Sequence, residues 1–225
     1  DLLYDATYFT VYNDNVPRMY RRFDTVEPQG IEIRQTIFAS GSVPELQDVI
    51  FIRYSILYKG RNEPPEPNTL NDVIFSVWND ADIGDAIDDL GGCDTTLRSS
   101  IIYNDGSDNI WDENPPAIFR TLLQGPKIKT NNEENIAYNR KGQAIGEESI
   151  NGWRNGKIGA YISSIGVSID NRAATAAQAR YHMEGLGTTG EIIDPCNFSY
   201  GEITGGIDCN SVNPYFWYSG DPVSN

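Results

Sequence analysis

The clearest structural signal in this chain is the stretch DVIFIRYSILYK at residues 48–59. It is a long run of β-branched and aromatic residues, which are enriched in strands. Residues 30–39 precede it and alternate, with Ile31, Ile33 and Ile37 on one side and charged or polar residues between them. Alternation of this kind is typical of a half-buried strand. Because the tract SGSVPEL between the two runs supplies turn chemistry, the pair predicts a hairpin or a longer antiparallel connection.

Further strands are predicted on both sides of this pair. Residues 8–13 are strand-like and run into the turn-rich NDNVP, and residues 73–78 and 97–103 are two later strand-like runs. Residues 157–170 give the last strand-like stretch. Several short strands separated by turn signals predict a mainly β fold, an antiparallel β-sandwich-like domain with long loops.

One helix is predicted near residues 172–185, because its alanines favour helix and Gly185 and Gly187 end it. Residues 133–153 are polar and glycine-punctuated and are expected to be irregular. No repeat and no low-complexity linker divides the chain, so residues 1–225 are expected to form a single domain. Both ends of the sequence look as if they were cut from a longer chain. The chain is therefore expected to be a fragment or a processed part of a longer protein.

The negative charge is concentrated in one region. The formal net charge is −15, and residues 62–119 hold thirteen acidic residues against Arg98 as the one base. Such a surface repels nucleic acid and anionic lipid and favours metal ions or basic partners. No apolar stretch approaches the length of a membrane span, so membrane insertion is not expected.

The centre of this acidic region is NDADIGDAIDDLGGCD at residues 79–94, and no Lys or Arg lies between Arg61 and Arg98. Carboxylates crowded without a local cation repel one another. A hard divalent cation that takes six to eight oxygen ligands, such as calcium, is the expected counter-charge. The predicted ligands are Asp80, Asp82, Asp85 and Asp89, followed by Asp88 and Asp94.

The spacing of the aspartates and the glycine argues against an EF-hand type of calcium site. The segment DADIGD at residues 80–85 resembles the start of an EF-hand loop, but its glycine comes one residue early and no glutamate follows at the twelfth position. The sequence therefore predicts a calcium loop at a strand end. The alternative is a solvated acidic loop in which each aspartate shapes a turn. A second turn, YNDGSDN, offers Asp105, Asp108 and Asn109 to the same site or another, although turn formation alone explains these residues.

Cysteine placement suggests one disulfide. Cys196 and Cys209 lie in a loop-like tract, where a bridge would contribute roughly 3 kcal/mol in the chain-entropy picture. The alternative is two free thiols in a cytosolic protein. Cys93 fits as a small buried hydrophobe, and the sequence leaves open whether it is paired.

Catalysis finds little support, and the chain is not expected to be an enzyme. The single histidine, His182, falls in the predicted helix with no nucleophile motif around it. Zinc is not expected with one histidine and scattered cysteines. Paired carboxylates leave a glycoside hydrolase as an alternative, but the pairs at 133–134 and 147–148 lie in polar, solvated tracts.

Aromatic side chains in loop-like segments allow a binding role. Trp111, Trp153 and Trp217 are candidates for stacking on sugar rings, which suggests a calcium-assisted carbohydrate-binding module as a second function. These rings also fit two other interpretations, pinning of long loops to the core and burial against another subunit.

Motifs spread over nearly the whole chain resemble a β-rich region of large secreted bacterial surface proteins, which often carry a type IX secretion sorting domain at the C-terminus. The motifs are VYNDN at 11–15, GIEIRQT at 30–36, VIFIRYSILYKG at 49–60, SVWNDADIGD at 76–85, DDLGGCDTT at 88–96, YN at 103–104, PPA at 115–117, QGP at 124–126 and SGDP at 219–222.

The resemblance implies export, a β-rich fold and a longer parent chain. Together with the acidic loop, it leads us to expect an extracellular or cell-surface module that calcium stabilises. Its expected role is structural or adhesive, as part of a surface or filamentous assembly, through self-association or contact with other surface proteins.

Overall fold

The computed structural model describes most of the first 129 residues and short segments beyond them. The described residues are 4–60, 69–79, 81–85, 88–94, 97, 99–104, 106–129, 153–156, 175–184, 186 and 189–190, with the backbone alone at 90–94, 128 and 153–155. The chain divides into two compact units, Asp1–Ile74 and Phe75–Asn225. No helix in the described ranges is long and apolar enough to span a membrane.

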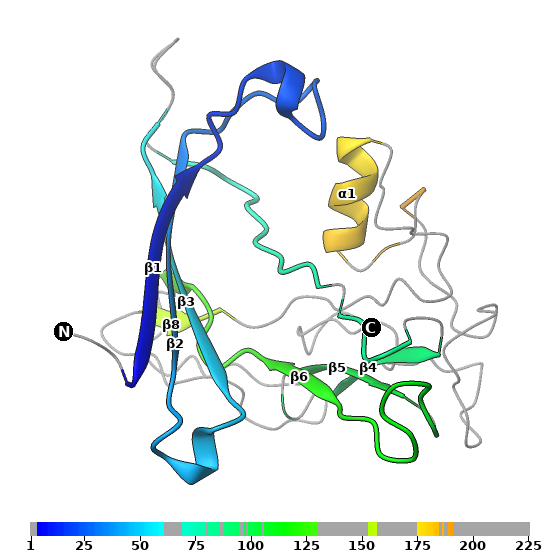
Figure 1. Cartoon of the computed structure of the whole chain (residues 1–225). Coiled ribbons are helices and arrows are strands. Elements are labelled where there is room, and N and C mark those ends of the chain that lie inside the picture. The colour runs from blue at the N-terminus through cyan, green and yellow to red at the C-terminus, as the bar shows by residue number, and fades with distance from the viewer. Residues whose placement is uncertain are drawn as a thin grey trace. The chain divides into compact units, whose positions relative to one another are not determined.

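The first unit contains a three-stranded antiparallel sheet in the order β1–β2–β3 (Figure 1). The strands are β1 (Ala6–Asn13), β2 (Ile31–Ala39) and β3 (Ile50–Tyr58). Two short 3₁₀ turns lie in the connections, η1 (Arg18–Tyr20) and η2 (Pro44–Leu46). The alternation seen in the sequence therefore places β2 in the centre of the sheet, where it is the best buried of the three strands.

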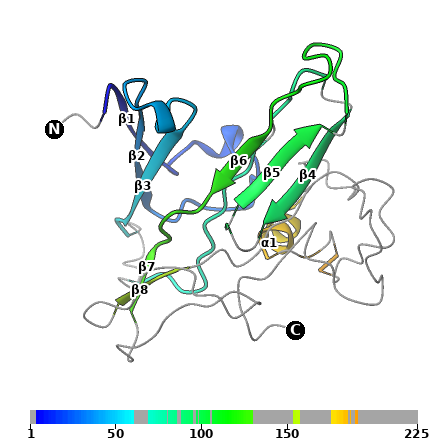
Figure 2. The same ribbon diagram turned by 90° about the horizontal axis from the view of Figure 1, so that it is seen from below.

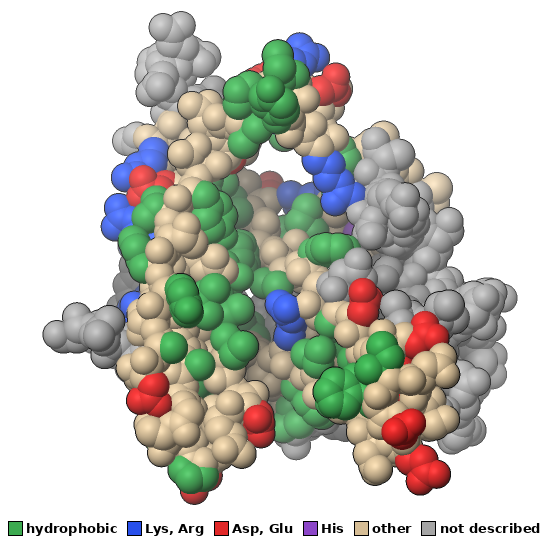
Figure 3. All heavy atoms as spheres, in the orientation of Figure 1, with side chains coloured by type: hydrophobic (Ala, Val, Ile, Leu, Met, Phe, Trp, Pro, Cys, Tyr) green, Lys and Arg blue, Asp and Glu red, His purple; other side chains and the backbone are tan. Residues whose placement is uncertain are grey.

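The register separates this sheet into two faces. Tyr8 pairs with Ile37, which pairs in turn with Ile52, so the three side chains share one face. On the opposite face Phe38 and Phe51 stack with ring centroids 5.1 Å apart, and Tyr4 stacks on both. Hydrophobic side chains remain exposed on β1 and β3, as the green surface of this unit shows (Figure 3).

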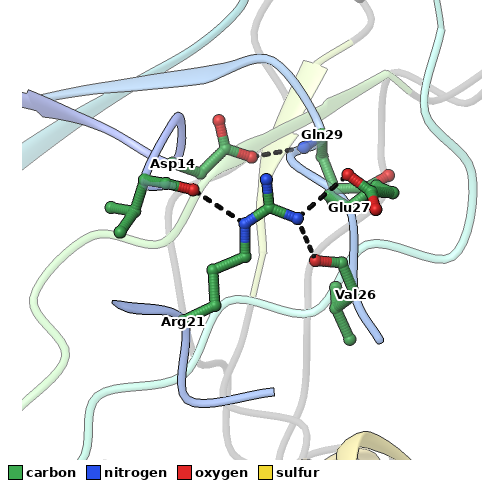
Figure 4. A network of polar contacts seen from close by, with 6 residues as sticks. Asp14, Arg21, Val26, Glu27 and Gln29 are labelled. Atoms are coloured by element: carbon green, nitrogen blue, oxygen red, sulfur yellow. Dashed lines mark hydrogen bonds and ion pairs between the residues drawn. The ribbon is translucent and has the colours of Figure 1, made fainter. Parts of the chain in front are cut away.

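Arg21 organises the long connection between β1 and β2 (Figure 4). Its Nε donates to the carbonyl of Val16 at 2.7 Å, and its Nη1 donates to the carbonyl of Val26 at 2.8 Å and to the Glu27 carboxylate at 2.9 Å. The guanidinium group is planar and carries several donors, so one side chain satisfies acceptors on both arms of the connection.

Asp14 closes the same connection at its base (Figure 4). Its carboxylate accepts the backbone N–H groups of Gln29 and Ile31, the latter at 3.0 Å. Gly30 lies between these two donors with a φ of +76°, and a Cβ there would lie 2.7 Å from the carbonyl carbon of Gly60. Glycine is therefore required at this crossing.

The described part of the second unit contains two small antiparallel sheets and one helix (Figure 2). One sheet has the order β4 (Asp89–Asp94), β5 (Ser99–Asn104) and β6 (Ile118–Thr121), and the other pairs β7 (Lys127–Lys129) with β8 (Trp153–Asn155). Helix α1 (Ala176–Met183) begins at Thr175, which forms a reciprocal capping box with Gln178.

The prediction of a mainly β fold with antiparallel sheets and one helix is confirmed. The strands expected at residues 8–13, 30–39, 48–59 and 97–103 correspond to β1, β2, β3 and β5. The strand expected at 157–170 lies outside the described residues. The single-domain expectation stays a prediction.

Two local predictions are wrong. Residues 73–78 form no strand, although they are apolar and β-prone; their large side chains are mostly exposed, and the boundary between the units falls within them. The calcium loop predicted within residues 79–94 included residues 89–94, yet these form β4. Propensity does not supply a pairing partner, whereas β5 supplies one to β4 along all six residues.

Candidate functional site

The predicted calcium loop leads directly into β4. The chain turns at Gly84, which has a φ of +73°, and reaches Asp89 at the first position of the strand. The structure places Asp82 and Asp88 at the surface and leaves Asp85 half-buried. Asp80 lies outside the described residues, and Asp94 is described on β4 without its side chain.

Asp89 is the buried carboxylate of this loop, with 8% of its surface exposed. Its Oδ2 accepts the backbone N–H of Ile83 at 2.9 Å, while its Oδ1 is buried and has no hydrogen-bond partner among the described residues. Burial raises the pKa of Asp89, and the carboxylates of Asp88, Asp82 and Asp108 raise it further against the opposing Ile83 N–H. A positive charge near Oδ1 would offset both the cost of burying the Asp89 charge and its repulsion by the neighbouring carboxylates.

Asp108 arrives from the turn between β5 and β6 and fastens the loop. It is 4% exposed, and its Oδ2 accepts the backbone N–H of Asp85 at 2.8 Å. Its Oδ1 accepts the N–H groups of Ile110 and Trp111, both at 2.7 Å. Hydrogen bonds from the backbone, first from Asp85 and then from residues 109–111, lower the pKa of Asp108 despite its burial. Both its oxygens are thus committed to backbone amides.

The sequence pointed to this turn only weakly. Asp108 and Asn109 were expected chiefly to form a turn, and the structure adds a link to the aspartate loop, since Asn109 Nδ2 donates to Asp85 Oδ2 at 2.8 Å. Asp105 lies outside the described residues. Asp108 and Asp112 also exchange backbone hydrogen bonds of 2.8 and 2.9 Å, which closes the turn on itself.

We expect Asp108→Asn to lower the melting temperature of the metal-free second unit by roughly 5 °C or more, because an amide cannot accept the same three bonds. The pKa of Asp108 is lowered in the folded protein, so its stabilising effect is present above the ordinary carboxyl pKa and is lost as pH falls through the folded value. Thermal melts of both proteins from pH 7 to pH 2 measure this. The difference between them should shrink in acid, and a difference independent of pH would contradict the role given to the carboxylate.

Two asparagines near this loop were missed by the sequence reading. The Nδ2 atoms of Asn79 and Asn104 are buried and have no hydrogen-bond partner among the described residues. Asn104 is the register partner of Asp89 on β5. No local sequence pattern relates this asparagine to the acidic loop, and only strand pairing places it opposite Asp89.

The described carboxylates of this loop do not form a metal cluster by themselves. Within the described ranges, no group of three or more His, Cys, Asp and Glu side chains is arranged to hold a metal ion. Asp89 nevertheless offers a buried, unpartnered oxygen, which is the type of ligand that calcium takes. Among the described residues, amide and backbone oxygens are the remaining candidates for ligands.

The other predicted sites are described only in part. Trp111 is 51% exposed, and its backbone N–H donates to Asp108 Oδ1, so this residue belongs to the acidic turn. Trp153 lies on β8 without a described side chain, and Cys93 lies on β4 in the same state. Trp217, Cys196 and Cys209 lie outside the described residues.

Comparisons with protein-family models, with curated proteins and with solved structures find no match to this chain.

Proposed function

We propose that this chain is an extracellular or cell-surface module with a structural or adhesive role, and that calcium stabilises it without catalysis. The observation that carries the calcium proposal is the buried Asp89 carboxylate, whose Oδ1 is unpartnered within the described residues and which lies among other carboxylates. A buried charge of this kind is unfavourable unless it is paired. The export and surface location come from the resemblance to secreted bacterial surface proteins.

The proposed mechanism is rigidification of the second unit. Calcium binds six to eight oxygens, so one ion joins segments that are distant in sequence. The loop at 81–85, the start of β4 and the turn at 106–112 already contact one another through Asp89 and Asp108. Extracellular calcium modules bind with dissociation constants of about 10⁻⁴–10⁻³ M, which suits a site that fills only outside the cell.

Self-association is the proposed mode of assembly, with other surface proteins as alternative partners. Among the described strands, β1 lies at an edge of its sheet, and it exposes Tyr8, Phe9 and Val11. An edge strand with apolar side chains is a common template for pairing with another chain.

Adding calcium to metal-stripped protein is expected to raise the melting temperature of the second unit. At a concentration 100 times the dissociation constant, mass action stabilises the folded state by about 2.7 kcal/mol. Scanning calorimetry measures the shift, and sedimentation velocity on the same samples measures assembly. Magnesium at equal concentration is the control and should act more weakly, because it demands a stricter octahedral geometry. A melting temperature unchanged by calcium would contradict the proposal.

A carbohydrate-binding role is the second candidate, supported by the exposed aromatic residue Trp111 of the acidic turn. If sugars stack on this ring, Trp111→Ala should weaken binding on a glycan array by about fivefold or more, since stacked aromatic contacts contribute roughly 1 kcal/mol or more each. Trp78→Ala removes another exposed tryptophan and is the matched control. Equal binding by the wild type and both variants would exclude Trp111 as a sugar platform.

A further inference from the structure

Asp89 and Asn104 face each other across β4 and β5. They are direct register partners at the end of the strand pair, so their side chains lie on the same face of the sheet with Cβ atoms about 5 Å apart. Asp89 Oδ1 and Asn104 Nδ2 are both buried, and neither has a hydrogen-bond partner among the described residues. Two adjacent polar groups are therefore buried without being joined.

A third buried amide belongs to the segment that leads into this place. Asn79 lies four residues before Ile83, whose N–H binds the other oxygen of Asp89, and Asn79 Nδ2 also lacks a partner in the described part of the chain. Each buried group left without a hydrogen bond costs about 1–3 kcal/mol. Two such groups paired across β4 and β5, with a third on the segment that leads to Ile83, favour a ligand that completes them.

The unpartnered atoms are the carboxylate oxygen of Asp89 and the amide nitrogens of Asn104 and Asn79, and the potential at Asp89 is negative. The carboxylates of Asp88, Asp82 and Asp108 all act on Asp89, and no cation among the described residues offsets them there. A half-turn of an asparagine amide about its last bond exchanges nitrogen and oxygen in the same space, so both amides can present Oδ1. After such a half-turn Asn104 presents an amide oxygen beside the carboxylate of Asp89, and Asn79 presents one from the segment that leads to Ile83.

We propose that Asp89 Oδ1 and the side-chain oxygens of Asn104 and Asn79 form the seat of a hard divalent cation, calcium, at the paired end of β4 and β5. This deepens the calcium-stabilised function proposed above and rests on it. Asp82 and Asp88 lie exposed at the rim and attract the ion without being required ligands. Asp108 holds the loop through backbone amides and does not bind the ion.

This arrangement differs from a site made by the aspartate run. A single buried carboxylate with neutral amide oxygens carries less negative charge than a site made only of carboxylates. Calcium affinity decreases when the ligands carry less negative charge. It also agrees with the finding that no three described acidic, histidine or cysteine side chains converge. We therefore expect a dissociation constant near the weak end of the range, about 10⁻³ M.

Calcium titration calorimetry on the metal-stripped full chain tests the seat. Asp89→Asn and Asn104→Leu should weaken binding by about 100-fold and 10-fold or more, respectively. Asp82→Asn and Asp88→Asn are matched charge controls and should stay within about threefold of the wild type, because exposed charges are screened. Asp89→Asn keeps an acceptor for the Ile83 N–H and removes the buried charge, so it should melt no lower than the metal-free wild type.

Asn104→Asp is the second variant and should act in the opposite direction. An added carboxylate beside Asp89 should lower the melting temperature without metal and tighten calcium binding by roughly tenfold. A bridging water in place of the ion would give the same destabilisation with no change in calcium affinity, which would overturn the seat.

The two proposals fail in different ways. Wild-type protein that binds no calcium overturns both the seat and the calcium-stabilised function. The seat alone is overturned by a different result. In that case the wild type binds calcium, Asp82→Asn or Asp88→Asn abolishes the binding, and Asp89→Asn and Asn104→Leu retain it. The ion would then belong to the aspartate loop.

Discussion

Ile83→Ala is expected to lower the free energy of unfolding of the second unit by about 2–5 kcal/mol, the usual cost of truncating a fully buried isoleucine. Ile83 is 2% exposed and is the one buried hydrophobic side chain in the part of the chain that the structure describes. It lies between Asp82 and Gly84, so its burial fixes the loop that carries the acidic residues. Its N–H also binds Asp89, and this bond should loosen with the loop.

Urea unfolding of the metal-free protein measures the loss, with Ile110→Ala as the matched control. Ile110 belongs to the same unit and is 67% exposed, so its truncation should cost less than about 0.5 kcal/mol. Ile83→Val removes one methyl group and should cost about 0.5–1.5 kcal/mol. Equal losses for Ile83→Ala and Ile110→Ala would show that Ile83 does not anchor the loop.

Gly84→Ala should destabilise the second unit by about 3 kcal/mol, through two effects that add. The φ of +73° lies in the left-handed region, which residues other than glycine adopt only at a cost in free energy. A Cβ at this position would also lie 2.6 Å from Cγ and Oδ2 of Asp108. The new methyl group would therefore push the Asp108 carboxylate away from the backbone amides that it binds.

A double-mutant cycle separates the clash from the backbone strain. In an Asp108→Ala background the carboxylate is absent, so Gly84→Ala should cost only the strain, about 1 kcal/mol. Gly60→Ala is a second control, because Gly60 has a similar φ of +81° with open space around its Cβ position. Urea unfolding of the four cycle members gives the coupling. Fully additive losses for the two substitutions would contradict a contact between them.

Local pattern was enough for the first unit. The runs at residues 30–39 and 48–59 alternate or are β-branched, and the turn tract between them sets an antiparallel connection, so β2 and β3 were identified within two residues at each end. The same rules failed at residues 73–78, where the composition suits a strand but no described strand pairs with them. Strand formation depends on pairing, which composition does not encode.

The sequence predicted only one part of the acidic site, the aspartate loop. A run of aspartates without a nearby cation marked the loop, because charge density is a local property. Asp108 is nineteen positions beyond Asp89, and its backbone contacts with the loop arise from the turn that follows β5. Asn104 becomes relevant through its register with Asp89, and a one-residue shift would turn it to the other face.

Composition and periodicity thus established a β-rich chain with an acidic loop and suggested a divalent cation, because these properties depend on neighbours along the chain. The separate roles of the aspartates came from folding. Burial left Asp89 with an unpartnered oxygen among the described residues, exposure set Asp82 and Asp88 at the rim, and backbone amides occupied Asp108. Identical side chains acquire different roles because solvent access and hydrogen-bond partners are set by segments far apart in sequence.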